Sequence, residues 1–198
     1  MRGDLKIISP WVEQRSTVLD LGCGDGSLLA HLQNEKSVNG YGIEIDPNQI
    51  TRCIENGVNV IEHDLDAKGL GSFQENQFDT VIMTQALQAV RRPDEMLEEM
   101  LRLGKQGIVT FPNFGHWRCR QYLLFNGKMP MSKTLPHTWF NTPNIHLCTF
   151  KDFEILCDQK GIRIVNRLVV NADFREKSLA RIWPNLLAEF AVYRIERR

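Results

Sequence analysis

The chain has 198 residues, 42% of them hydrophobic, which is enough to bury a core without disulfides or a structural metal. Its 24 basic and 24 acidic residues give a formal net charge of zero, which does not favour a nucleic-acid binder or a membrane-surface protein. No apolar run is long enough to span a bilayer, and the first residues lack a signal-peptide core. We therefore expect a cytoplasmic protein.

Cysteine and histidine usage argues against cross-links and metal. The number of cysteines is odd and no Cys-x-x-Cys pair occurs, so neither a disulfide framework nor a zinc site is favoured. The five histidines are scattered without ligand spacing. We expect no metal site, and reduced, buried thiols at Cys23, Cys53, Cys119, Cys148 and Cys157.

The most informative segment follows a short opening helix expected over residues 4–14, whose course Pro10 restricts. Residues 18–26 read Val-Leu-Asp-Leu-Gly-Cys-Gly-Asp-Gly, a strand that ends in three alternating glycines, and a helical pattern starts at Ser27. Glycine tolerates positive φ and lets a ligand approach the backbone closely. This segment predicts a strand, a ligand-binding turn and a helix.

The charge of this loop indicates which ligand it suits. Its spacing is G-x-G-x-G and differs from the dinucleotide fingerprint G-x-G-x-x-G. Asp20 and Asp25 lie in or beside the loop, where a pyrophosphate would be repelled. A nucleoside that carries positive charge fits better.

Two further strand ends carry acids. Residues 41–46 form an apolar strand that reaches Glu44, a natural acceptor for two ribose hydroxyls, and a helix is expected over 47–56. Residues 58–66 read as a short strand whose Asp64 could face an adenine edge. The alternative is a solvated turn in which Asp66 caps the following residues.

The remaining pattern alternates strands and helices to the C-terminus. The methionine and leucine residues of the helix expected over 93–103 are core packing, and Thr149 begins a capping box with Asp152. The last two strands should pair antiparallel at the sheet edge. The expected elements are strands over 78–83, 107–113, 162–170 and 187–195, and a helix from 149 to 161. We predict one α/β domain over residues 1–198 with seven strands.

The three strand-end signals resemble those of the Rossmann-like S-adenosylmethionine-dependent methyltransferases. The resemblance implies a seven-stranded, mostly parallel sheet with helices on both faces, a glycine loop against the methionine part of the cofactor, Glu44 at its ribose and Asp64 at its adenine. A doubly wound fold that lost its ligand or holds another nucleotide is the alternative. The residues implied to bind S-adenosylmethionine or S-adenosylhomocysteine are Asp20, Gly22, Cys23, Gly24, Gly26, Glu44, Ile45, Asp64, Leu65 and Thr84.

Two positions depart from that pattern. Gln88 follows the fourth strand, where many small-molecule methyltransferases carry histidine, and the loop before the fifth strand reads Leu-Gly-Lys-Gln-Gly. Glutamine cannot act as a general base at neutral pH. Methyl transfer needs alignment more than an enzyme nucleophile, so activity stays open and we assign no catalytic residue.

Residues 111–148 are unusually aromatic and basic, and no acid occurs between Glu99 and Asp152. One interpretation is a helical hairpin with aromatics on the sheet and solvated basic residues. The other is an interface for an acidic partner, since aromatic and arginine side chains are enriched at interfaces. Nucleic acid is disfavoured at zero net charge. Under the second interpretation the partner-binding residues are Trp117, Arg118, Arg120, Trp139 and Phe140.

Four segments together resemble the MetW family of methionine biosynthesis proteins: residues 18–26, 110–117, 136–140 and 144–150. The resemblance implies a companion of homoserine O-acyltransferase (MetX type). Our first hypothesis is therefore an accessory subunit that binds S-adenosylmethionine or S-adenosylhomocysteine and activates that enzyme. The alternative is an active methyltransferase whose small acceptor lies between residues 84–88 and 111–117.

Overall fold

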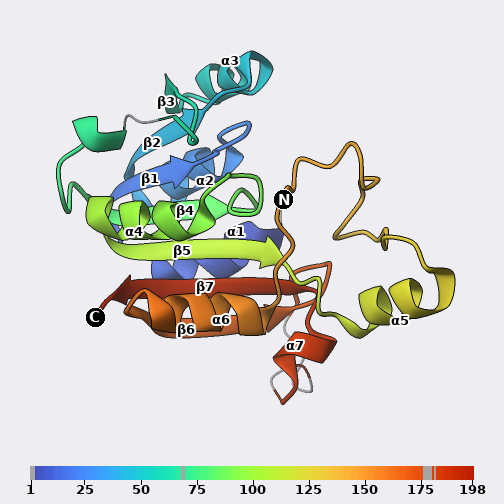
Figure 1. The fold of residues 1–198 in the computed structure, drawn as a ribbon. Coiled ribbons are helices and arrows are strands. Elements are labelled where there is room, and N and C mark those ends of the chain that lie inside the picture. The colour runs from blue at the N-terminus through green and yellow to red at the C-terminus, as the bar shows by residue number, and fades with distance from the viewer. Residues whose placement is uncertain (1–2, 68–69, 176–179, 181) are drawn as a thin grey trace.

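The computed structural model describes residues 3–67, 70–175, 180 and 182–198, of which the side chains of residues 4 and 5 are not described. Seven strands form one sheet in the order β3-β2-β1-β4-β5-β7-β6 (Figure 1). Strands β1 to β5 pair in parallel, whereas β7 is antiparallel to both β5 and β6. The strands are β1 (Thr17–Leu21), β2 (Asn39–Glu44), β3 (Asn59–Glu62), β4 (Phe78–Thr84), β5 (Gly104–Pro112), β6 (Ile162–Val170) and β7 (Phe190–Arg197). The predicted seven-stranded, mostly parallel sheet is confirmed.

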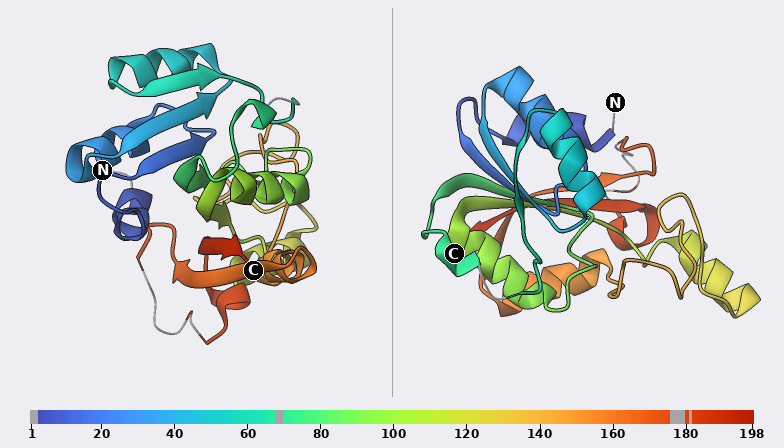
Figure 2. Two further views of the ribbon diagram at one scale, coloured as in Figure 1. Left: turned by 90° about the vertical axis from the view of Figure 1, so that its left-hand side faces the viewer. Right: turned by 90° about the horizontal axis from the view of Figure 1, so that it is seen from above.

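Helices cover both faces of the sheet, as predicted (Figure 2). One face packs under α1 (Gly3–Ile8), α2 (Ser27–Lys36) and α3 (Pro47–Glu55), and the other under α4 (Pro93–Leu103) and α6 (Phe150–Gln159). Helix α5 (Trp117–Asn126) follows β5, and helix α7 (Pro184–Leu187) precedes β7.

The central strands are apolar on both sides because both faces are covered. In β5, Ile108 packs in the core under α1 and α2, whereas Val109 and Phe111 pack in the core under α4 and α6. Side chains alternate across a strand, so a buried parallel strand needs apolar residues at nearly every position. This explains the continuous apolar runs that predicted the strands.

Several predicted boundaries are wrong by a few residues. The opening helix ends at Ile8 and gives way to a 3-10 turn, Ser9–Trp11, that contains Pro10. Strand β3 covers Asn59–Glu62, the first part of the segment 58–66 in which a short strand running into an acid was predicted. Strand β5 starts at Gly104, where pairing with Phe78 of β4 extends it into the expected loop.

The helical-hairpin interpretation of residues 111–148 is wrong. Helix α5 is followed by irregular chain over residues 127–149, with no second helix among them. The end of this chain is fixed to the body, since Ile145 N and His146 N donate to Gln88 O at 2.9 and 3.0 Å. The capping box predicted at the start of α6 is confirmed, with Thr149 and Asp152 each accepting from the other's backbone.

Candidate ligand-binding site

The glycine loop lies between β1 and α2, at the carboxyl edge of the parallel strands. Gly22, Gly24 and Gly26 have φ of 71°, 57° and 72°, the left-handed region that favours glycine. A Cβ on Gly22 would lie 3.0 Å from Ala86 Cβ, and one on Gly26 would lie 3.0 Å from Cys53 Sγ. A Cβ on Gly24 would meet nothing within 4 Å. The backbone of the middle glycine therefore borders open space.

Backbone and side-chain bonds hold this loop in place. Gly22 N and Cys23 N both donate to Ile43 O of β2, at 2.9 and 3.1 Å. Gly24 N donates to Glu44 Oε2 at 2.8 Å, and Gly24 O accepts from Cys53 Sγ at 3.0 Å. The loop is thus preorganised by β2 and α3 before any ligand arrives.

The side chain of Cys23 packs in the core under α2 and α3, away from the open side of Gly24. Its sulfur lies 3.7 Å from Cys53 Sγ, and 2.4 Å from where Gly42 would carry a Cβ. Burial, reinforced by the Asp20 carboxylate, raises the pKa of the Cys23 thiol. A neutral, buried thiol leaves only the backbone of Cys23 for the predicted ligand contact.

Glu44 ends β2 and turns its carboxylate to the loop. Its Oε1 accepts from Ile45 N and Asp46 N at 2.8 and 3.0 Å, in addition to the Gly24 bond at Oε2. An ionised carboxylate accepts about four hydrogen bonds, so about one position stays open. The predicted contact with two ribose hydroxyls would require release of one backbone donor.

Asp64, the third acid predicted at a strand end, forms a hydrogen bond within its own loop. Asp64 is exposed two residues beyond Glu62, the register partner of Glu44, and its Oδ1 accepts from Asp66 N at 2.9 Å. Asp66 Oδ1 accepts from Arg91 N at 2.7 Å, and the predicted cap by Asp66 falls on residues 68 and 69, outside the described residues. Asp64 therefore lies just beyond the end of β3, at the same edge of the sheet as Glu44.

The other predicted cofactor residues lie around this edge. Leu65 Cδ1 would be 4.0 Å from a Cβ on Gly22, and Ile45 is 56% exposed just beyond Glu44. Asp20 and Thr84 are buried near the ends of β1 and β4. The structure thus gathers residues from four separate strand ends along one border of the sheet.

The turn after β4 is packed inward. Gln88 is 3% exposed, and its Nε2 donates to Cys148 Sγ at 3.2 Å. Burial raises the pKa of Cys148 to about 12, so this thiol is neutral at physiological pH.

Within the described chain no three His, Cys, Asp or Glu side chains could hold a metal ion together. No described helix has the length and apolar composition of a membrane span.

The predicted partner-binding residues do not share one environment. The Arg118 guanidinium stands 5.4 Å from the centre of the Trp117 ring and 3.7 Å from Glu189, whereas Arg120 Nε donates to Gly115 O at 2.6 Å. Trp139 and Phe140 pack edge to face and are exposed. Leu124 and Phe125 of α5, which the sequence analysis did not place among the partner-binding residues, are also exposed.

Solved structures identify the fold. A methyltransferase dependent on S-adenosylmethionine from Archaeoglobus fulgidus has a TM-score of 0.71 at 15% identity, covering 98% of this chain and 91% of that one. A TehB-like methyltransferase from Corynebacterium glutamicum has a TM-score of 0.65 at 16% identity, covering 100% and 89%. The chain therefore has the Rossmann-like fold of S-adenosylmethionine-dependent methyltransferases.

Sequence comparison then gives the family. The family model of "Methionine biosynthesis protein MetW" matches residues 2–195, and the chain belongs to this family. It is 34% identical, over 92% of its length, to the bifunctional methionine biosynthesis protein MetXA/MetW of Rhodopirellula baltica, of which it spans 30%. It is 30% identical, over 51% of its length, to a ubiquinone biosynthesis O-methyltransferase of Pseudomonas fluorescens, of which it spans 47%.

Proposed function

We propose that the chain binds S-adenosylmethionine or S-adenosylhomocysteine at the glycine loop and serves as an accessory subunit that activates homoserine O-acyltransferase. The ligand part is supported by the loop itself. Three glycines at positive φ, open space beside Gly24 and a carboxylate at the end of β2 fit a nucleoside that lies across the strand ends.

The proposed contacts follow from the donors and acceptors present. Glu44 would accept from the ribose through its remaining position, and Leu65 would pack beside the adenine with Asp64 at its edge. The buried Asp20, at the end of β1, would favour the positive sulfonium by charge. The bound group would supply the sulfonium, and with it a methyl group if transfer occurs.

One observation carries the accessory role: in the relative from Rhodopirellula baltica, a single chain joins MetXA to the part that this chain matches. Fusion keeps two proteins at a high local concentration, which favours partners that work in contact. The chain would then bind the same kind of partner.

The test has two independent readouts. Acyl transfer to homoserine should be measured for the acyltransferase of the same cell, with and without this chain, and a rate that does not change would remove the accessory role. Calorimetry with S-adenosylhomocysteine tests ligand binding by the wild-type chain and by Glu44→Ala. Glu62→Ala is the control for Glu44→Ala, because Glu62 is exposed on the neighbouring strand. Titration of the ligand against the complex then shows whether the two bindings are coupled.

A working methyltransferase is the second candidate, favoured by the similarity of half the chain to ubiquinone biosynthesis O-methyltransferases. Its acceptor would lie between residues 84–88 and 111–117. Release of S-adenosylhomocysteine from S-adenosylmethionine in a cell extract is the readout. Replacement of Trp139 or Arg118 separates the two candidate functions. Under the accessory role these changes weaken binding to the acyltransferase and leave ligand binding unchanged.

A further inference from the structure

Helix α5 projects from the body of the molecule at the carboxyl edge of β5 (Figure 1), and the view from above shows the same projection (Figure 2). Cys119 is its one buried residue, and every residue from 120 to 129 is exposed. Leu124 is 77% exposed and Phe125 is 78% exposed. We call Tyr122, Leu123, Leu124 and Phe125 the α5 tip.

The α5 tip is costly to leave in water. An isolated helix of this length is marginally stable, and most helices gain stability by packing an apolar face. Here Gly127 ends the helix at φ 59° with its N–H bonded to Leu123 O at 3.0 Å. The four large side chains of the tip belong to neither core cluster of the described residues. Residues 122–125 are consecutive in the helix, so their side chains point about 100° apart and surround its free end. Exposed apolar side chains gathered in this way indicate an interaction site.

Basic side chains flank the tip, although Arg118 lies 3.7 Å from Glu189, and Asp173 lines the same pocket as Arg118 and Lys133. Arg118 and Lys128 flank it along the chain, Lys133 follows, and residues 100–151 contain no Asp or Glu. Lys128 and Lys133 form no ion pair with any described residue. A surface with this rim is complementary to a partner whose groove is edged by carboxylates.

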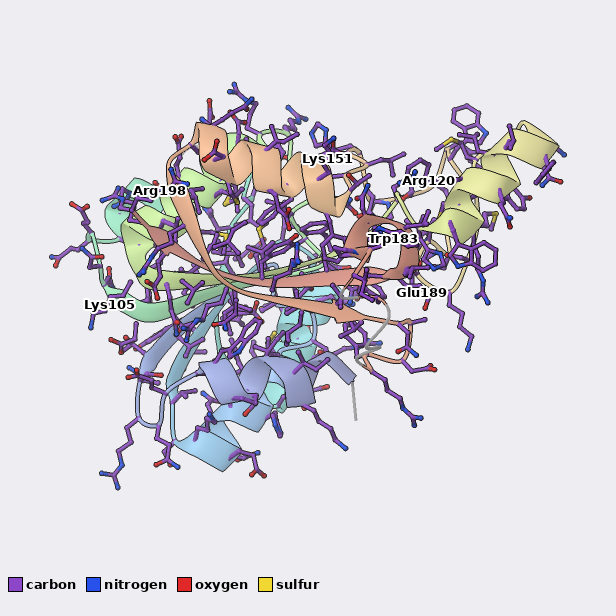
Figure 3. All side chains as sticks on the ribbon, turned by 90° about the horizontal axis from the view of Figure 1, so that it is seen from below. Lys105, Arg120, Lys151, Trp183, Glu189 and Arg198 are labelled. Atoms are coloured by element: carbon purple, nitrogen blue, oxygen red, sulfur yellow. The ribbon has the colours of Figure 1, made fainter. Side chains whose placement is uncertain are left out.

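A pocket beside the helix adds a second feature. It has a volume of about 200 Å³, comparable to one large apolar side chain, and Phe114, Met129, Leu135, Trp139, Ile145 and Leu147 line it. Arg120, Trp183 and Glu189 lie at this same end of the molecule, whereas Lys105 and Arg198 lie at the other (Figure 3). Apolar anchors in such pockets often dominate binding energy.

We propose that the α5 tip is the docking element for the acyltransferase subunit, which encloses this end of the helix in an apolar groove with an acidic rim. An apolar side chain of that subunit fills the pocket lined by Trp139. This inference rests on the proposed accessory role, because that role supplies the partner. It differs from the sequence-based prediction by placing the main contact at Leu124 and Phe125.

The test compares matched surface variants. The double variant Leu124→Ser with Phe125→Ser should raise the Kd for the acyltransferase by about 30-fold or more, the scale of an interface hot spot. Ile54→Ser is the control, because Ile54 is 66% exposed on α3, away from α5. Lys128→Glu with Lys133→Glu should slow association most at low salt. Unchanged S-adenosylhomocysteine binding and melting temperature would show that each variant folds.

The outcomes separate the two proposals. A complex that survives Leu124→Ser with Phe125→Ser at unchanged Kd and activation overturns the docking assignment and leaves the accessory role standing. Absence of any complex or activation with the wild-type chain overturns the accessory role, and this assignment with it. Self-association that the double variant abolishes, or loss of binding to anionic vesicles with no effect on the acyltransferase, would assign the tip to a second copy or a membrane and overturn the proposal.

Discussion

The thiol of Cys53 lies 3.0 Å from the carbonyl oxygen of Gly24 and ties α3 to the middle of the glycine loop. Gly24 also donates its N–H to Glu44, so both the amide and the carbonyl group of Gly24 are hydrogen-bonded to side chains. Its conformation therefore depends on a side chain 29 residues away in sequence. Changes to Cys53 should reach the ligand through the backbone of the loop.

Replacing Cys53 tests this tie. Cys53→Ala removes the donor to Gly24 O and leaves a small cavity at a fully buried position, so we expect a loss of about 1–2 kcal/mol in unfolding free energy. S-adenosylhomocysteine should bind several-fold more weakly. Cys53→Ser keeps a donor, and calorimetry should find its affinity nearer to wild type. Equal ligand affinity for all three proteins would contradict the role of the thiol.

Gly24 and Gly57 form a matched pair. Both have positive φ, 57° and 70°, and a Cβ on either would meet nothing within 4 Å. Alanine should therefore cost each about 1 kcal/mol of stability through backbone strain. Gly24→Ala alone should lower S-adenosylhomocysteine affinity tenfold or more, because its methyl group fills the open side of the loop. Equal affinity of the two variants would place the ligand elsewhere.

Removal of the Glu44 carboxylate should weaken both the loop and the ligand. Glu44→Ala leaves three backbone N–H groups without their present acceptor, and we expect about 1–3 kcal/mol of lost stability. Glu44→Gln keeps one oxygen and should lose less. Melting temperatures and S-adenosylhomocysteine Kd values check this order, and a Glu44→Gln variant that behaves like wild type would argue against a role for charge.

Asp79 joins three strands at the opposite edge of the sheet and gives a pH-dependent prediction. The Lys105 ammonium at 2.6 Å, with the Thr17 amide and hydroxyl at 2.9 Å, lowers the pKa of the Asp79 carboxyl. A lowered folded-state pKa contributes stability above the unfolded value of about 3.9, and this contribution disappears as pH falls through the folded value.

Asp79→Asn should therefore lower the unfolding free energy by about 1–2 kcal/mol at pH 7, and the difference from wild type should shrink below about pH 4. Denaturant titrations across this pH range measure it. Glu75→Gln is the control, because Glu75 pairs with Arg197 in an exposed ion pair that contributes little. A constant difference from pH 7 to pH 3 would rule out the proposed charge interaction.

Local signals in the sequence were sufficient for the glycine loop, Glu44 and the start of α6. Alternating glycines, an acid at a strand end and a Thr–Asp capping box are each encoded by neighbouring residues, and each lies where the sequence predicted. The edge pairing of the last two strands was also predictable from their two apolar runs.

Features set by distant partners were not predictable. Strand β5 extends to Gly104 because Phe78 pairs with it, and sequence neighbours do not encode that register. The apolar run of α5 resembles a core helix, and only the fold shows that its tip faces away from the sheet. Glu44 likewise uses three acceptor positions on backbone groups, which reduces its predicted capacity for ribose.

The position of β7 between β5 and β6 makes synthesis order matter. Strand β6 has β7 as its sole strand neighbour in the described sheet, although β7 follows it in the chain. While the ribosome has yet to release β7, β6 has no strand to join, and the edge of β5 offers unpaired backbone groups to other nascent chains. Slow translation of the closing segment would therefore lengthen exposure of an aggregation-prone intermediate.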